Sequence, residues 1–126
     1  MGLREGSPYT VTVDEGARTV LLKGAGNGTT DDTLELIAHV LQTLRAVPGY
    51  HVLYDAVELQ IESSPQAMMK VAQALFGSGI KYGRFAVVVP PQRDSLARIF
   101  TALANDNDVV ADVFNNVSEA RRWIYS

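Results

Sequence analysis

The sequence predicts a single α/β domain whose mixed, mostly parallel sheet is flanked by helices. The 126 residues are enough for one hydrophobic core. Segments typical of strands and helices follow one another in the order β-β-α-β-α-β-α-β-α, and such alternation requires crossovers between parallel strands. The first two strands are joined by a short turn and are therefore antiparallel. We expect a flexible leader over residues 1–8 and the domain over residues 9–126.

The expected strands are short runs of alternating or continuous apolar residues. Alternation over Tyr9–Val13 and the apolar run within Arg18–Lys23 predict the opening hairpin. The nearly continuous apolar runs His51–Tyr54 and Arg84–Val89 are typical of strands that are covered on both faces. A last strand is expected around Val110–Phe114.

Apolar residues at helical spacing predict four helices, over Thr33–Val47, from Pro65 to Gly77, over Gln92–Asn105 and after Asn116. Ser64 is expected to be the N-cap of the second helix, because proline is favoured at the first helical position. The inward stripes of the first two helices are expected to be Leu34, Ile37, Ala38, Leu41 and Leu44, and Met68, Val71, Ala72 and Leu75.

The glycine-rich run Gly24–Gly28 lies between a strand and a helix, where a phosphate-binding loop would lie. Its GxGxG spacing matches neither the dinucleotide-binding fingerprint nor a P-loop. Asp31 and Asp32 follow at the start of the helix, where carboxylates occupy the positive end of the helix dipole and repel a phosphate. We therefore expect a flexible loop that ends in an N-cap.

Composition excludes several classes of function. The net charge of −3, with acids and bases scattered along the chain, offers no basic patch for nucleic acid. The absence of cysteine excludes disulfides, thiol catalysis and thiolate metal sites. No signal-peptide core and no run long enough to span a membrane is present, so we expect a cytoplasmic protein without a cofactor.

Candidate site residues gather where the parallel strands are expected to end, because ligands of such sheets bind beyond the carboxyl ends of the strands. Asp55 is expected to end the strand that begins at His51. Val57, Leu59 and Ile61 then alternate with polar residues, which fits either a short strand or a structured loop with one side packed. The candidates at this edge are Asp55, Glu58, Glu62, Ser63, Ser64 and, on the neighbouring connection, Arg93.

The element order, the buried strand before Asp55 and the sequence Glu62-Ser63-Ser64 resemble the SpoIIAA-like or STAS domain, the fold of anti-sigma-factor antagonists. The resemblance extends from Tyr9 to Ile124. The closing residues are similar to a divergent, uncharacterised bacterial branch of that superfamily; they are Val113-Phe114, Glu119-Ala120 and Trp123-Ile124.

The resemblance implies a non-catalytic regulatory or protein-interaction module. In regulatory members, a serine in an Asp-Ser-Ser-Gly segment is phosphorylated by a partner kinase that is also the anti-sigma factor. This implies a phosphorylation switch at Ser63 and a partner of the anti-sigma or kinase kind. Here Glu62 replaces the aspartate and Pro65 replaces the glycine, which favours Ser64 as a plain helix cap.

Two other functions remain open. A small apolar ligand or lipid carrier would use a pocket lined by Met68, Met69, Phe76 and Ile80, although such residues also fill core gaps. An uncharacterised hydrolase would pair Asp55, Glu58 and Glu62, with Arg93 as an anion clamp, but no set of nucleophile, base and orienting residue is evident.

Self-association is also open. The first strand is expected at an edge of the sheet, where unpaired backbone groups favour pairing with a second chain. Val109 and Val110, with Tyr125, are expected to add apolar surface near the C-terminus. A homodimer and a monomer therefore both stay open.

Overall fold

The computed structural model describes residues 3, 5–61 and 64–126, and within them five strands form one sheet in the order β1-β2-β3-β4-β5. The hairpin pair β1 and β2 is antiparallel, and every later pair is parallel. This confirms the predicted fold class. The strands are β1 (Tyr9–Asp14), β2 (Thr19–Gly28), β3 (His51–Ile61), β4 (Phe85–Val88) and β5 (Ala111–Phe114). The helices are α1 (Thr30–Ala46), α2 (Pro65–Phe76), the 3-10 helix η1 (Pro91–Arg93), α3 (Asp94–Asp106) and α4 (Val117–Ile124).

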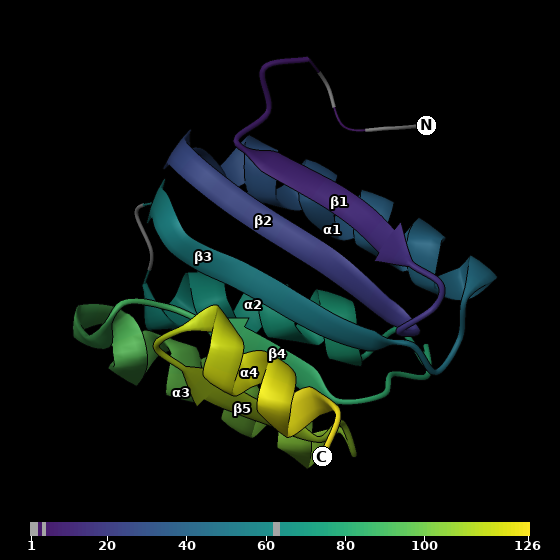
Figure 1. The fold of residues 1–126 in the computed structure, drawn as a ribbon. Helices are drawn as coiled ribbons and strands as arrows, with labels where there is room; N and C mark the ends of the chain where they lie inside the picture. Colours follow the sequence, from purple (N-terminus) through teal and green to yellow (C-terminus); the bar gives the residue numbers. More distant parts are fainter. Residues whose placement is uncertain (1–2, 4, 62–63) are drawn as a thin grey trace.

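The helices cover the two faces of the sheet unequally. Figure 1 shows α1, α2 and α3 behind the sheet, and α4 alone in front of β4 and β5. The larger core lies between the sheet and the three helices, with Val20, Val52 and Phe85 among its fully buried residues. The smaller core lies under α4, where Ala120 and Ile124 pack on the other face. On that face, β1 and β2 carry no helix within the described residues (Figure 1).

The run Gly24–Gly28 is not a flexible loop, so this prediction was wrong. It is the second half of β2, and Ala25 to Gly28 pair in parallel with Glu58 to Ile61 of β3. Glycine has little intrinsic preference for a strand, so the extended state comes from this long-range pairing. The expected N-cap is present: Thr29 Oγ1 accepts a hydrogen bond from Asp32 N–H at 3.2 Å, and the Asp32 carboxylate accepts one from Thr29 N–H at 2.9 Å.

Asp55 does not end a strand, which corrects a second prediction. β3 continues to Ile61, and the alternating segment is therefore strand rather than loop. Lys23 faces Asp55 and Ala25 faces Glu58, so two residues of β3 oppose the single Gly24 of β2. This is a β-bulge.

The bulge changes which residues of β3 face the helices. Val52 before the bulge, Ala56 within it and Leu59 after it are all buried in the larger core. A regular strand would send residues 56 and 59 to opposite faces, and the extra residue brings both to one face. Val57 lies in the bulge itself and is 39% exposed, although the alternation grouped it with Leu59.

The stripe predicted for helix α1 is confirmed at Ile37, Leu41 and Leu44 and is wrong at Leu34 and Ala38. Leu34 is 57% exposed and Ala38 is also exposed, whereas Leu36, Ile37, Val40 and Leu44 are buried. The helix has more apolar residues than fit on the face that packs against the sheet. The sheet covers the stripe that ends at Leu44, and Leu34 is left at the border.

The remaining helices begin as expected. Ser64 caps α2, Pro65 is its first residue, and Asn116 caps α4 by accepting a hydrogen bond from Glu119 N–H at 2.9 Å. Leu3 packs against the larger core, and the boundary of the leader stays a prediction. No helix in the described part of the chain is long and apolar enough to cross a membrane.

Candidate functional site

The carboxyl ends of β2, β3 and β4 meet at one edge of the sheet, and α1, α2 and η1 begin at this edge. We call it the carboxyl edge. Ser64 lies here, half-buried, and its Oγ accepts a hydrogen bond from Ala67 N–H at 3.1 Å, as an N-cap does. Glu62 and Ser63, the other two residues of the predicted signature, lie outside the described residues.

The described carboxylates of the predicted site have structural partners. Asp55 Oδ1 accepts a hydrogen bond from Val57 N–H at 3.2 Å, so it holds the bulge. Glu58 Oε2 lies 3.8 Å from Lys23 Nζ across β2 and β3, and both side chains are mostly exposed. An exposed ion pair of this kind contributes little to stability. The structure therefore places Asp55 and Glu58 in the sheet instead of in a paired acid–base arrangement.

Arg93, at the end of η1, reaches back to the bulge. Its guanidinium donates hydrogen bonds to the carbonyl oxygens of Ala56 and, at 3.3 Å, Val57. Beside it lies a shallow depression of about 370 Å³ on the surface, which we call the edge hollow. The edge hollow is lined by Val57, Glu58, Leu59, Gln60, Ile61, Pro90, Gln92 and Arg93.

A larger space, which we call the apolar cavity, lies between the sheet and the helices α1, α2 and α3. Its volume is about 670 Å³, within the ~300–1,000 Å³ typical of small-molecule sites. Most of its walls are aliphatic side chains and phenylalanine rings. Among its lining residues are Leu36, Ile37 and Val40 of α1, Met68, Val71 and Leu75 of α2, Phe100 of α3, and Leu22, Leu59, Phe85 and Val87 of the sheet.

The apolar cavity differs from the pocket that the sequence suggested. Of the four predicted residues, Met68 lines it. Met69 is 44% exposed on α2. Phe76 packs edge-on against Tyr82, Phe85 and Phe100, and Ile80 packs against the larger core. The structure therefore brings one of the four to the cavity and uses Phe76 and Ile80 for packing.

Two tyrosines, Tyr9 and Tyr54, are among the residues that line the apolar cavity. The hydroxyl groups of Tyr9 and Thr33 are 3.2 Å apart, within hydrogen-bonding distance. Burial raises the pKa of Tyr54 well above its ordinary value, and the neighbouring Tyr9, which hydrogen-bonds to it, raises it further, against an opposing effect of the Arg93 charge. The Tyr54 hydroxyl therefore stays protonated at neutral pH. Sequence reasoning did not identify Tyr9, Thr33 and Tyr54 as site residues, because each belongs to a different element and they meet only in the folded chain.

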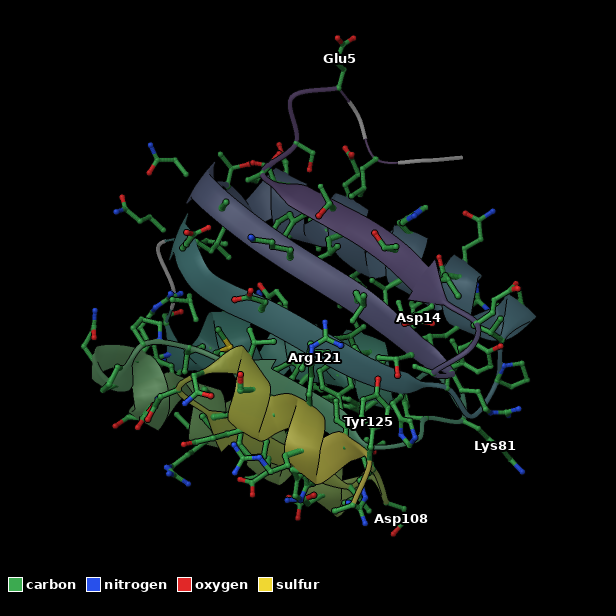
Figure 2. All side chains as sticks on the ribbon, viewed as in Figure 1. Glu5, Asp14, Lys81, Asp108, Arg121 and Tyr125 are labelled. Atoms are coloured by element: carbon green, nitrogen blue, oxygen red, sulfur yellow. The ribbon has the colours of Figure 1, made fainter. Side chains whose placement is uncertain are left out.

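Both histidines lie away from these residues. His39 is in the middle of α1, and His51 begins β3 at the opposite edge, where its Nδ1 accepts a hydrogen bond from Arg84 N–H at 2.9 Å. The His51 ring contacts Tyr125, which Figure 2 labels beside the C-terminal end of α4. Within residues 3, 5–61 and 64–126, no group of three or more His, Asp or Glu residues is placed to hold a metal ion.

The five-stranded sheet, with three helices on one face and one on the other, defines a SpoIIAA-like fold. The chain is similar to a solved structure from Shewanella loihica PV-4, described as an uncharacterised protein from the DUF3478 family with a SpoIIAA-like fold. The TM-score is 0.62 at 18% sequence identity, over 92% of this chain and 91% of that one. The predicted resemblance is therefore confirmed for the fold. No protein-family model and no curated protein matches the sequence.

Proposed function

We propose that the protein is a non-catalytic binding module of the STAS type that contacts a partner protein through the carboxyl edge. The observation that carries the proposal is the edge hollow. There the bulge leaves Val57 exposed next to Glu58 and Gln60, and Arg93, which donates a hydrogen bond to the Val57 carbonyl oxygen, lines the same hollow. Protein interfaces usually combine an apolar centre with a polar, solvent-accessible rim, and Val57 with its polar neighbours offers this arrangement on a small scale.

The non-catalytic part of the proposal is supported by how the polar groups are used. Asp55 accepts a backbone hydrogen bond in the bulge, and Glu58 lies beside Lys23. His51 lies at the other end of β3. General acid–base catalysis needs such groups within hydrogen-bonding reach of one reacting atom.

A phosphorylation switch at Ser63 belongs to this proposal and rests on the sequence resemblance. A phosphate would add about two negative charges at the start of α2. We expect Ser63→Asp to change the affinity for the partner protein and Ser63→Ala to keep the unphosphorylated affinity. If neither substitution changes partner binding, the switch is wrong while the binding module remains.

The experiment compares two exposed valines. Immobilised protein captures partners from a lysate of its own cells, and quantitative mass spectrometry compares wild type with Val57→Asp and Val110→Asp. Val110 precedes β5 at the opposite edge and is 58% exposed. We expect Val57→Asp to lose the specific partner and Val110→Asp to keep it. Equal retention by both variants would contradict the assignment of this edge.

A homodimer and a cytoplasmic location also remain part of the proposal. Of the surface predicted for self-association, Val110 and Tyr125 are exposed, whereas Val109 is buried. β1 is an edge strand of the sheet. Light scattering during size-exclusion chromatography will give the molar mass, and a monomer mass at micromolar concentration would rule out a stable dimer.

We also propose a second candidate function, binding of a small apolar ligand, and the apolar cavity is the observation that supports it. Its volume of about 670 Å³ is within the range of small-molecule sites, and the space opens to the surface, because the exposed residues Leu34, Gln66 and Lys70 are among its lining. A cavity with mostly apolar walls and a few polar groups is the usual form of a ligand site.

A further inference from the structure

The apolar cavity is polar at one end and apolar at the other. Most of its polar lining residues belong to the starts of the helices at the carboxyl edge; these are Thr30, Thr33, Ser64, Gln66 and Arg93. Lys70, in the middle of α2, and the two tyrosines Tyr9 and Tyr54 line it as well. Towards the opposite edge the lining is apolar, with Val40 in the middle of α1, Leu75 near the end of α2 and Phe85 at the start of β4. A ligand that matches these walls has a polar head and an apolar chain.

The charged residues that line the apolar cavity in the described part of the chain are both basic. Lys70 and Arg93 line it, and no Asp or Glu is among the described lining residues. This differs from the whole chain, in which 14 acids outnumber 11 bases. A cleft lined by charges of one sign attracts ligands of the opposite sign.

The start of α2 adds to the positive potential. The first turn of α2 contains no acidic residue, whereas α1 has Asp31 and Asp32 there and α3 has Asp94. The positive end of the α2 dipole is therefore not offset within its own first turn. Lys70 lies on the same helix and is exposed at the cavity border.

We infer that the apolar cavity binds a single-chain amphiphile with one acidic headgroup, placed with the acid at the carboxyl edge and the chain between α1 and α2. This inference rests on the second candidate function, which requires only an apolar ligand. Arg93 and Lys70 supply the positive charge, and the hydroxyl groups of Tyr54 and Thr33 supply further hydrogen-bonding groups. Charged hydrogen bonds of this kind are about twice as strong as neutral ones.

The test uses three probes with the same twelve-carbon chain: dodecanoate, dodecan-1-ol and dodecyltrimethylammonium, each below its micelle concentration. Isothermal titration calorimetry measures their affinities for the full chain after removal of co-purified lipid on a hydrophobic resin. We expect dodecanoate to bind about tenfold more tightly than the alcohol, and the cation to bind least, as one charged hydrogen bond predicts.

Two matched pairs of variants locate the ligand. Lys70→Glu is expected to weaken dodecanoate about tenfold without changing the alcohol. Lys81→Glu is expected to change neither, because Lys81 lies at the opposite edge (Figure 2). Ala74→Trp, which fills the cavity border, is expected to weaken both probes, whereas Ala102→Trp, exposed on α3 and outside the lining, is not. Circular dichroism checks that each variant is folded.

The outcomes separate the two levels of the inference. If acid and alcohol bind equally and Ala74→Trp weakens both, the apolar-ligand function holds and the acidic headgroup is wrong. If no probe binds, both are wrong. If dodecanoate binds but Ala74→Trp and Lys70→Glu leave it unchanged, the ligand lies elsewhere and the assignment of the cavity is wrong.

Discussion

Replacing Gly24 by alanine is expected to lower the free energy of unfolding by about 1–3 kcal/mol, the usual cost of overpacking a core. A Cβ at this position would lie 3.1 Å from Leu59 Cδ1 and 3.1 Å from Tyr9 Cε1. Both side chains are buried, with 3% and 2% of their surface exposed, so neither can swing into solvent. Gly24 stands opposite the bulge, and its missing side chain is what allows Leu59 to turn inward there.

Gly28→Ala in the same strand is the matched control. A Cβ on Gly28 would lie 3.4 Å from Leu59 Cδ1 and 3.6 Å from the Tyr9 hydroxyl oxygen, at ordinary contact distance. Neither glycine has a positive φ, so alanine fits both backbones. Because alanine restricts the unfolded chain, Gly28→Ala is expected to be neutral or to stabilise by about 0.4–1 kcal/mol.

Urea denaturation followed by circular dichroism measures both variants. Thermal denaturation is a second measurement, in which a loss of 1 kcal/mol in the free energy of unfolding lowers the melting temperature by about 3–5 °C for a domain of this size. If Gly24→Ala is as stable as Gly28→Ala, then Leu59 does not pack against Gly24, and the bulge that we place at Ala56 and Val57 is wrong.

Three further predictions concern α1, α2 and β3. Leu44→Ala is expected to lower the free energy of unfolding by about 2–5 kcal/mol because Leu44 is fully buried, and Leu34→Ala by less than about 0.5 kcal/mol because Leu34 is exposed. Equal losses in urea denaturation would mean that Leu34 is buried, as the sequence predicts. Ser64→Ala is expected to cost about 1 kcal/mol by loss of the α2 cap, and Ser64→Asp to keep most of it; identical melting temperatures for all three proteins would contradict the cap. Burial, and then the positive charge of Arg84, lower the pKa of His51 in the folded chain, so the unfolded chain takes up a proton more readily. The contribution of neutral His51 to the free energy of unfolding is therefore fully present above pH ~6.5 and is lost as the pH falls below that value. His51→Asn is expected to flatten the fall in melting temperature between pH 7 and pH 5, and an unchanged slope would refute this.

Local sequence patterns predicted the features that depend on interactions between residues close together in the chain. The hairpin follows from two strands joined by a short turn. The start of α2 follows from Ser64 before Pro65, and the start of α4 from Asn116, because capping residues satisfy backbone N–H groups within their own turn. These features need no knowledge of distant residues.

The second half of β2 was missed because its strand state is not local. Gly24–Gly28 has a composition typical of a loop, and it becomes a strand only by pairing with Glu58–Ile61, more than thirty residues away. The sequence did carry a signal for the bulge in β3 opposite Gly24. Val52 and Tyr54 have one parity and Leu59 and Ile61 the other, and a strand that keeps both sets on one face requires a bulge.

The apolar cavity was missed for a related reason. A helical stripe such as that of α1 shows which side chains avoid water, but not whether a neighbouring element fills the space beside them. The wall combines residues of α1, α2, α3 and the four strands β1 to β4, so it exists only in the assembled fold. Helix α1 has more apolar residues than the sheet covers, and Leu34, exposed at the border of the cavity, is one of those left uncovered.

The bulge in β3 connects the two candidate sites. On one side it exposes Val57 at the edge hollow, and on the other it turns Leu59 towards the apolar cavity. Arg93 lines both spaces and donates to the bulge carbonyl groups, so a substitution there would disturb both sites at once. Val57 lines the hollow alone and Lys70 lines the cavity alone. Loss of partner binding in Val57→Asp with unchanged dodecanoate affinity would therefore assign the protein surface to the hollow, and the converse in Lys70→Glu would assign the acid to the cavity.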